Sequence, residues 1–180
     1  MNVFIAGPRA ISKLDNVILE RLRSICDKKY TVFVGDANGI DKAVQKFLFE
    51  IGYANVSVFV SGNAARNNIG NWQVKNIEVD KKLKGFDFYA QKDLAMAKQA
   101  DYGFMIWNGE SKGTLNNIIN LIGDGKKVLV YFTPNKQFIS IGCKEELETF
   151  LASCPTQTQE LYRELAAKGL QSDVQISLFA

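Results

Sequence analysis

Short apolar runs alternate along the chain with longer segments in which apolar residues recur every three or four positions. The first run, residues 2–6, ends in a Gly-Pro-Arg turn and is followed by apolar side chains at helical spacing from Leu14 to Ile25. This pattern is typical of a strand, a turn and a helix. The strands predicted in this way are 2–6, 30–34, 55–60, 101–107 and 127–132, and the helices are about 14–25, 40–51, 86–100 and 113–122.

The regular alternation of strands and helices predicts the fold class. Parallel neighbouring strands need a crossover of about a dozen residues, and a helix normally supplies it. We therefore predict an α/β protein with a three-layer, Rossmann-like arrangement, in which helices cover both faces of a mainly parallel five-stranded sheet. Residues 61–85 have no clear pattern, so we expect a long loop there with at most one short strand, at 74–79.

The alternation stops after Pro134. Residues 145–151 and 157–167 have helical patterns, and Pro155 and Gly169 are placed to begin and end the second helix. We therefore predict two parts, a domain over residues 1–133 and a C-terminal helical appendage over residues 134–180 that packs on the same domain.

Composition narrows the classes of function. The 180 residues include no histidine, which excludes Ser-His-Asp and Cys-His nucleophiles and histidine metal sites. The three cysteines are widely spaced without a CxxC pair, so we expect neither a zinc site nor a disulfide framework. No apolar run approaches the ~20 residues of a membrane helix. We therefore predict a cytoplasmic protein without a metal site, a cofactor or a membrane-spanning segment, and the sequence leaves open whether its ligand requires a metal ion.

Charge is distributed unevenly. The formal net charge is +3, but residues 1–143 carry 19 basic and 13 acidic side chains, whereas residues 144–180 carry 3 and 6. The first part of the chain therefore favours anionic ligands.

Three predicted turns follow strands of the sheet and lead into helices. They are Gly7-Pro8-Arg9, residues 35–39 and residues 108–114. In an open α/β sheet, ligands bind outside the carboxyl ends of the strands, so we expect these turns to form the site.

The third turn has the chemistry of a phosphate site. Gly113 and Thr114 open a helix, where a glycine permits close approach and free N–H groups point at an anion. Ser111 and Thr114 can donate hydroxyl hydrogen bonds, and Lys112 can supply positive charge. The same residues also fit a plain capped helix with a solvated lysine, because the full P-loop pattern is absent.

Other residues add to the candidate site. Gly39 permits close contact with a ligand, and Asp41 either caps the following helix or binds a ligand hydroxyl. Arg9, Arg66 and Lys92 are candidate phosphate contacts. The two tryptophans, at positions 72 and 107, either stack on a base or pack in the core.

Four ordered elements resemble the SLOG superfamily, which groups the Lonely Guy phosphoribohydrolases with the Smf, or DNA-processing A, proteins. They are Gly7-Pro8-Arg9 after the first strand, the Gly35–Asp41 turn, Ala100-Asp101 before a strand, and Gly113-Thr114. The resemblance covers about residues 1–133 and implies a Rossmann-like nucleotide-binding domain.

The sequence is most similar to the YspA-like and YpsA-like branch of this superfamily. The matching residues are Arg66-Asn67 and the Ser111–Thr114 turn, and the resemblance implies a nucleotide or nucleotide-derived ligand. The ligand-binding residues that we predict are Gly7, Arg9, Gly35, Asn38, Gly39, Asp41, Arg66, Asn67, Lys92, Ser111, Lys112, Gly113, Thr114 and Asn117.

Catalysis is the main alternative. The Lonely Guy enzymes have a glutamate three residues past the threonine, where this chain has Asn117, and an amide cannot exchange a proton near neutral pH. If the protein hydrolyses the N-glycosidic bond of a nucleoside monophosphate, we expect Glu110 or Asp36 to activate water or stabilise the ribosyl centre.

The partners follow from these readings. We predict binding without catalysis first, N-glycosidic hydrolysis second and single-stranded DNA binding last. A net charge of only +3 without a basic stripe makes a nucleic acid an unlikely partner on this reading. A homodimer is the oligomeric state that we expect.

Overall fold

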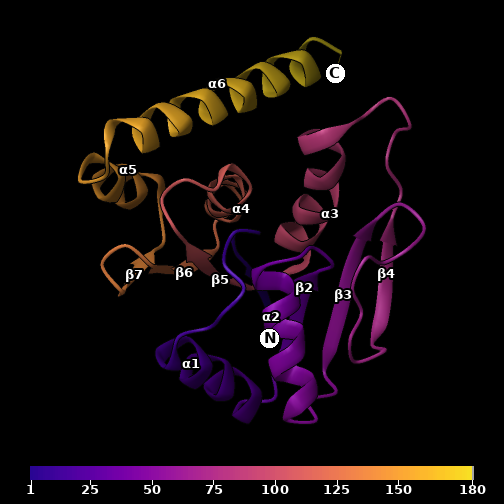
Figure 1. The fold of residues 1–180 in the computed structure, drawn as a ribbon. Helices are drawn as coiled ribbons and strands as arrows, with labels where there is room; N and C mark the ends of the chain where they lie inside the picture. Colours follow the sequence, from indigo (N-terminus) through magenta and orange to yellow (C-terminus); the bar gives the residue numbers. More distant parts are fainter. Residues whose placement is uncertain (180) are drawn as a thin grey trace.

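The computed structural model describes the backbone of residues 1–179 and the side chains of residues 1–168 (Figure 1). The strands are β1 (Asn2–Ala6), β2 (Thr31–Gly35), β3 (Val56–Ser61), β4 (Gln73–Ile77), β5 (Tyr102–Trp107), β6 (Lys127–Phe132) and β7 (Gln137–Ile141). The helices are α1 (Asn16–Asp27), α2 (Ile40–Glu50), α3 (Gly85–Gln99), α4 (Lys112–Gly123), α5 (Lys144–Ala152) and α6 (Thr156–Phe179).

The described strands form a seven-stranded sheet in the order β4-β3-β2-β1-β5-β6-β7. The first six strands are parallel to their neighbours, and β7 pairs antiparallel with β6. The predicted α/β fold with helices on both faces is confirmed. The sheet has two strands more than the five that we predicted, because β4 and β7 join its edges.

The edge strands were hard to predict for a physical reason: β7 was missed, and β4 was expected at most as a short strand at 74–79. Central strands of a parallel sheet are covered on both faces and appear as continuous apolar runs, and β1 is buried from Val3 to Ala6. The strand β4 is partly exposed along its whole length, and only Ile141 of β7 is fully buried. Partial exposure at the edge permits polar residues, so these two segments lack a strong apolar signal.

The hydrophobic core consists of two clusters, one on each face of the sheet. Val3 and Ile5 point to the cluster formed with α1 and α2, whereas Phe4 and Ala6 point to the cluster formed with α3 and α4. This alternation is expected of a strand, in which successive side chains point to opposite faces. The three layers that result are the sheet, α1 with α2 on one face, and α3 with α4 on the other.

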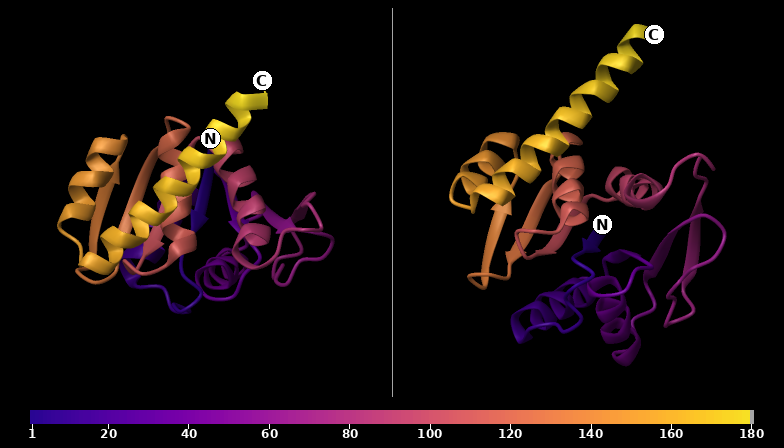
Figure 2. Two further views of the ribbon diagram at one scale, coloured as in Figure 1. Left: turned by 90° about the horizontal axis from the view of Figure 1, so that it is seen from above. Right: turned by 45° about the horizontal axis from the view of Figure 1, so that its top comes forward.

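The C-terminal segment packs on the second of these faces. Leu147 of α5 and Leu165 of α6 belong to the same core cluster as Trp107 of β5. Figure 2 shows α6 continuing beyond the sheet as a long helix. The boundary at residue 133 stays a prediction. No helix in the described part of the chain has the length and apolar character needed to cross a membrane.

Candidate functional site

A pocket of about 560 Å³ opens at the carboxyl ends of β1 and β5. These two strands are neighbours, but the chain leaves β1 toward β2 on one side and β5 toward β6 on the other. Loops that diverge in this way leave a crevice between them, which is where ligands bind in open α/β sheets. The walls come from residues 6–10 after β1, from α3, and from residues 108–117 after β5.

The loop after β5 is held in place before any ligand arrives. Asn108 Oδ1 accepts hydrogen bonds from the backbone N–H groups of Glu110, at 3.1 Å, and Ser111, at 2.9 Å. Trp107 Nε1 donates to the Ser111 carbonyl at 3.1 Å, and Thr158 of α6 donates to the Gly109 carbonyl at 2.9 Å. The start of α4 is therefore rigidly positioned at the rim of the pocket.

The N-terminus of α4 presents hydrogen-bond donors to this pocket. Ser111 caps the helix, and its Oγ accepts from Thr114 N at 3.3 Å and from Thr114 Oγ1 at 2.9 Å. The Ser111 hydroxyl hydrogen is left to donate elsewhere, and the N–H groups of Lys112 and Gly113 precede the first intrahelical hydrogen bond. Apart from the adjacent residues and the backbone of α4 itself, no described atom lies within 4 Å of the place where a Gly113 Cβ would stand, so a ligand can approach the backbone there.

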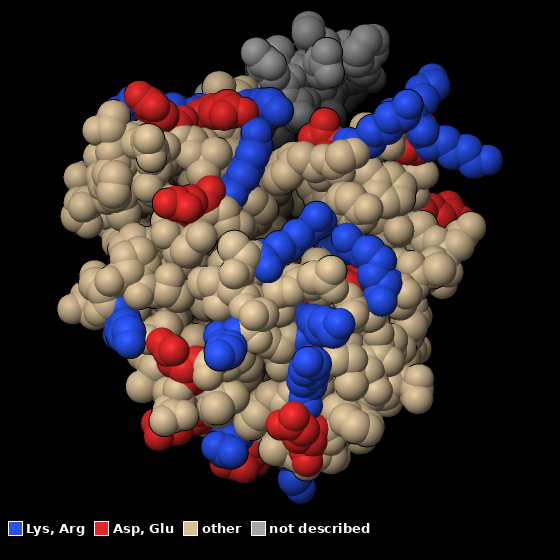
Figure 3. Space-filling view, in the orientation of Figure 1, with Lys and Arg blue, Asp and Glu red and all other residues tan. Residues whose placement is uncertain are grey.

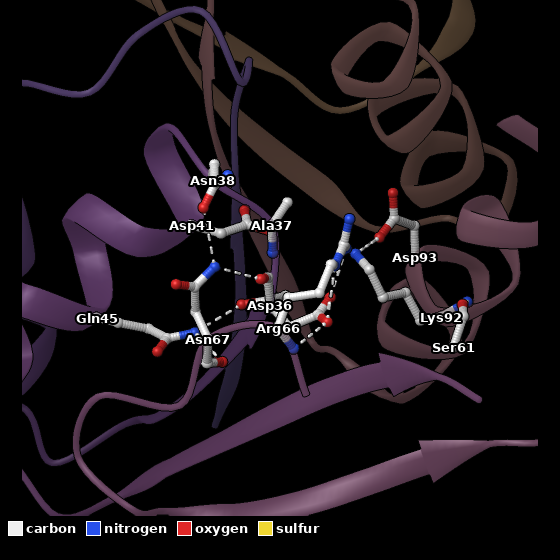
Figure 4. Close-up of polar contacts among 11 residues, drawn as sticks. Asp36, Ala37, Asn38, Asp41, Gln45, Ser61, Arg66, Asn67, Lys92 and Asp93 are labelled. Carbon is white, nitrogen blue, oxygen red and sulfur yellow. Dashed lines mark hydrogen bonds and ion pairs between the residues drawn. The ribbon is translucent and has the colours of Figure 1, made fainter. Parts of the chain in front are cut away.

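Three charged side chains, two of them buried, line the same pocket, and Figure 4 shows their contacts. Lys92 of α3 is 4% exposed and Asp41 of α2 is 5% exposed. Lys92 Nζ pairs with Asp93 Oδ1 at 2.6 Å, and Asp41 Oδ2 accepts from the Ala37 N–H at 3.2 Å. The three side chains all line the pocket.

Gly35 makes room for this cluster. A Cβ at Gly35 would overlap Asp41 Oδ2 and lie 2.7 Å from Lys92 Nζ. Glycine at the end of β2 therefore lets a carboxylate and an ammonium group approach the same point of the backbone.

The buried charges shift one another's protonation. Burial raises the pKa of Asp41 from 3.8 to about 6, against the attraction of Lys92. Burial also acts to lower the pKa of Lys92, but the carboxylates of Asp93 and Asp41 outweigh it, and the pKa is raised. The pocket therefore holds a protonated lysine beside a carboxyl group whose pKa is about 6.

Asp36 lies outside the pocket and has a structural partner. Its carboxylate accepts from Arg66 N at 3.0 Å, from Nε at 3.0 Å and from Nη2 at 2.7 Å. Burial acts to raise the pKa of Asp36, but the hydrogen bonds and charge of Arg66 lower it below 3.8. The ion pair joins the loop after β3 to the turn after β2.

The side-chain amides of Asn67 and Gln45 also hold the loop after β3 against the turn after β2. Asn67 Nδ2 donates to the Asp36 carbonyl at 2.8 Å and to Asn38 Oδ1 at 3.1 Å. Gln45 Nε2 donates to the Gly35 carbonyl at 2.9 Å and to the Asn67 carbonyl at 3.2 Å. Asn38 and Asn67 therefore hold two loops together and do not line the pocket.

Basic side chains gather beside the pocket. The guanidinium groups of Arg9 and Arg66 lie 5.1 and 4.4 Å from the ring centre of Tyr89, which lines the pocket. Figure 3 shows Lys and Arg side chains gathered in the middle of the face that α2 covers. Arg9 is exposed and also lines the pocket, so its guanidinium can reach an anion there.

Asn117 is the most unusual polar residue of the site. It lines the pocket on α4 and is 3% exposed. Its Oδ1 is buried without a hydrogen-bond partner among the described residues. Buried polar atoms normally have hydrogen-bond partners, so the Asn117 amide is placed to bind a polar group of a ligand.

The structure brings together part of the predicted site. The predicted residues that line the pocket are Gly7, Arg9, Asp41, Lys92, Glu110, Ser111, Gly113, Thr114 and Asn117. Those that support it from outside are Gly35, Asp36, Asn38, Gly39, Arg66 and Asn67. Lys112 points elsewhere, because its Nζ pairs with Glu164 of α6 at 2.7 Å. Trp107 is fully buried and packs in the core instead of stacking on a base.

Sequence reasoning predicted only Lys92 among the residues of α3 that line the pocket. Phe86, Tyr89 and Asp93 line the pocket, and none was a candidate. Asp93 adjoins Lys92 in the sequence, and this adjacent pair of opposite charges in a helix was the one available signal. No group of three or more His, Cys, Asp or Glu side chains within the described residues is arranged to hold a metal ion.

Comparisons with known proteins give one informative match. No protein-family model and no curated protein sequence matches the chain. A solved structure of DNA processing protein A from Helicobacter pylori matches with a TM-score of 0.58 and 14% sequence identity. The alignment covers 93% of this chain and 81% of that chain.

This match corrects the prediction that nucleic acid is an unlikely partner. The matched protein has a single-stranded DNA binding mode. Net charge averages the whole surface, so a value of +3 does not exclude a local site that binds a nucleic acid, and the prediction was wrong. The shared sheet and helices show that this chain has a fold related to that of DNA processing protein A, as the SLOG resemblance implied.

Proposed function

We propose that the pocket binds a nucleotide or nucleotide-derived ligand, with a phosphate at the N-terminus of α4. The observation that carries the proposal is the capped start of α4, whose free N–H groups open into a pocket of about 560 Å³. That volume lies within the ~300–1,000 Å³ of ordinary small-molecule sites. Helix N-termini favour phosphate because backbone N–H groups and the helix dipole act together.

The charges of the pocket orient such a ligand. Arg9 and the donors of α4 line the pocket and attract a phosphate, whereas the carboxylates of Asp41 and Asp93, which also line it, repel one. Tyr89 and Phe86 of α3 add aromatic surface beside the pocket, and a nucleobase can pack against such surface.

A ligand screen by thermal denaturation tests this function. Nucleoside 5′-monophosphates at 100 times their Kd should raise the Tm by about 5–10 °C, since binding to the native state alone adds about 2.7 kcal/mol. Arg9→Ala should weaken binding about tenfold, because it removes a charge-assisted hydrogen bond. Arg23→Ala, an exposed arginine of α1 that does not line the pocket, is the matched control.

The proposal fails if no nucleoside monophosphate raises the Tm. It fails equally if Arg9→Ala and Arg23→Ala bind with the same affinity.

Single-stranded DNA is the second candidate ligand, and the matched structure favours it. Basic side chains beside the pocket (Figure 3) could contact neighbouring phosphates while one nucleotide occupies the pocket. Fluorescence anisotropy with a labelled oligodeoxynucleotide should then show binding that weakens steeply with salt, because phosphate contacts release counterions. Absence of binding at low ionic strength would exclude this candidate.

N-glycosidic hydrolysis is supported less by the structure than by the resemblance. Glu110 lines the pocket, but Asp36 does not, because Arg66 holds its carboxylate. Chromatography of the nucleotides used in the screen detects free base if cleavage occurs.

The finer assignment, to the YspA-like and YpsA-like branch, is also a proposal. It rests on Arg66-Asn67 and on the turn from Ser111 to Thr114. In the structure, Arg66 and Asn67 both bind Asp36 and so hold the loop after β3 to the turn after β2.

A further inference from the structure

The buried amide oxygen of Asn117 lowers the stability of the unliganded protein. A buried acceptor without a partner loses its hydrogen bonds to water and gains none in return. Asn117 Oδ1 is in this position, although the residue lies in a regular helix and has an open pocket beside it. A ligand that donates a hydrogen bond would remove the cost.

The place of Asn117 on α4 indicates which part of a ligand it meets. Thr114 and Asn117 are three residues apart on the same face of the helix, so their positions differ by about 4.5 Å along its axis. If a phosphate lies at the start of α4, the group attached to that phosphate passes beside Asn117. In a nucleoside 5′-monophosphate, that group is the sugar.

The surrounding side chains complement a sugar. Asp41 and Asp93 line the same pocket with carboxylate oxygens, which only accept hydrogen bonds when ionised. Lys92 Nζ, which pairs with Asp93 Oδ1 at 2.6 Å, is a donor in the same pocket. Hydroxyl groups both donate and accept, so vicinal hydroxyls satisfy carboxylate, amide and ammonium groups together. Rotation of the Asn117 amide exchanges its oxygen and nitrogen, so either atom can face the sugar.

We propose that Asn117, together with Asp41, recognises the ribose hydroxyls and makes the pocket selective for ribonucleotides over deoxyribonucleotides. This inference rests on the proposed nucleotide binding and adds the class of sugar. A ligand that lacks a hydroxyl leaves the buried polar groups unpaired, and sites of this kind reject such analogues strongly.

Isothermal titration calorimetry tests the selectivity. The probes are the 5′-monophosphate that binds most tightly in the thermal screen and its 2′-deoxy and 3′-deoxy analogues. The wild-type protein should bind the ribonucleotide at least about tenfold more tightly than one of the deoxy analogues. Asn117→Ala should reduce that preference to about twofold or less, chiefly by weakening the ribonucleotide.

Two further variants make the result specific. Asn120→Ala changes another asparagine of α4 that does not line the pocket, and it should leave the preference unchanged. Asn117→Asp keeps acceptor oxygens at the same place and should retain a preference for the ribonucleotide. The Tm of unliganded Asn117→Ala should equal or exceed that of the wild type, because the variant removes a buried unpaired group.

The outcomes separate this inference from the proposed function. If nucleotides bind and the wild type shows no preference for ribose, the inference is wrong and nucleotide binding stands. If Asn117→Ala lowers the Tm and keeps the preference, the residue is structural and the inference is again wrong. If no nucleotide binds, the proposed function is wrong and the inference falls with it.

Discussion

Gly39→Ala is expected to lower the free energy of unfolding by about 3 kcal/mol, which corresponds to a Tm about 6–12 °C lower. Gly39 has a φ of +80°, which disfavours any residue with a Cβ. An added Cβ would also lie 2.5 Å from the Arg9 carbonyl oxygen and 2.6 Å from its carbon. These are main-chain atoms, so no side-chain rotation relieves the overlap.

The substitution should also weaken ligand binding. Gly39 lies where the turn after β2 touches the loop after β1, and Ile40 N donates to the Pro8 carbonyl at 3.2 Å across the same contact. Separating the two loops moves Arg9 and the wall of the pocket to which it belongs. Because small displacements in a binding site are costly, we expect nucleotide affinity to fall about tenfold or more.

Gly52→Ala is the matched control for this experiment. Gly52 has a φ of +67°, but no described atom lies within 4 Å of the position of its added Cβ. Backbone strain without overlap should cost about 1 kcal/mol. Urea denaturation of both variants measures the two costs separately. Equal losses at the two glycines would show that contact with the Arg9 backbone contributes nothing.

Much of the fold was predictable because its centre is buried on both faces. The strands β1, β2, β3, β5 and β6 are apolar runs, and their predicted ranges overlap the observed strands closely. The edge strands were harder to predict, because exposure weakens the apolar pattern. The parallel strand β4 is also reached through residues 62–72 without an intervening helix, which breaks the alternation that guided the prediction.

The candidate site was predictable where it depends on topology. Turns after β1 and β5 meet at the point where strand order reverses, so Arg9 and Ser111 were expected together and both line the pocket. The partner of a long charged side chain was less predictable from the sequence. Lys112 pairs with Glu164, which lies 52 residues further along the chain, and nothing near Lys112 in the sequence indicates that partner.

Two aspartates, Asp36 in the turn after β2 and Asp41 at the start of α2, show that the same side chain can have opposite pKa shifts in different surroundings. Asp36 and Asp41 are both buried, at 2% and 5% exposure. Asp36 receives three hydrogen bonds from Arg66, and they lower its pKa below 3.8. Asp41 receives one from Ala37, and burial raises its pKa to about 6. Sequence spacing alone could not assign these opposite shifts, because Arg66 comes from a distant loop.

Asp41→Asn is expected to change how stability depends on pH. The folded protein holds the Asp41 proton up to a pKa of about 6, whereas the unfolded chain releases it near 3.8. The unfolded state therefore loses its proton first, and Asp41 makes wild-type stability fall as pH rises from about 4 to about 6. The asparagine variant lacks this loss. Its free energy of unfolding should gain about 3 kcal/mol relative to wild type across that range.

Urea denaturation of the two proteins at intervals from pH 4 to pH 7 measures this difference directly, since titrating groups distant from Asp41 contribute equally to both. Asp36→Asn is the control, because its lowered folded-state pKa leaves Asp36 ionised in both states above about pH 5. The free energy of unfolding of that variant should be lower than that of the wild type by a constant amount from pH 5 to pH 7. A parallel curve for Asp41→Asn as well would mean that the buried carboxylate is stabilised by Lys92 as fully as it is by water.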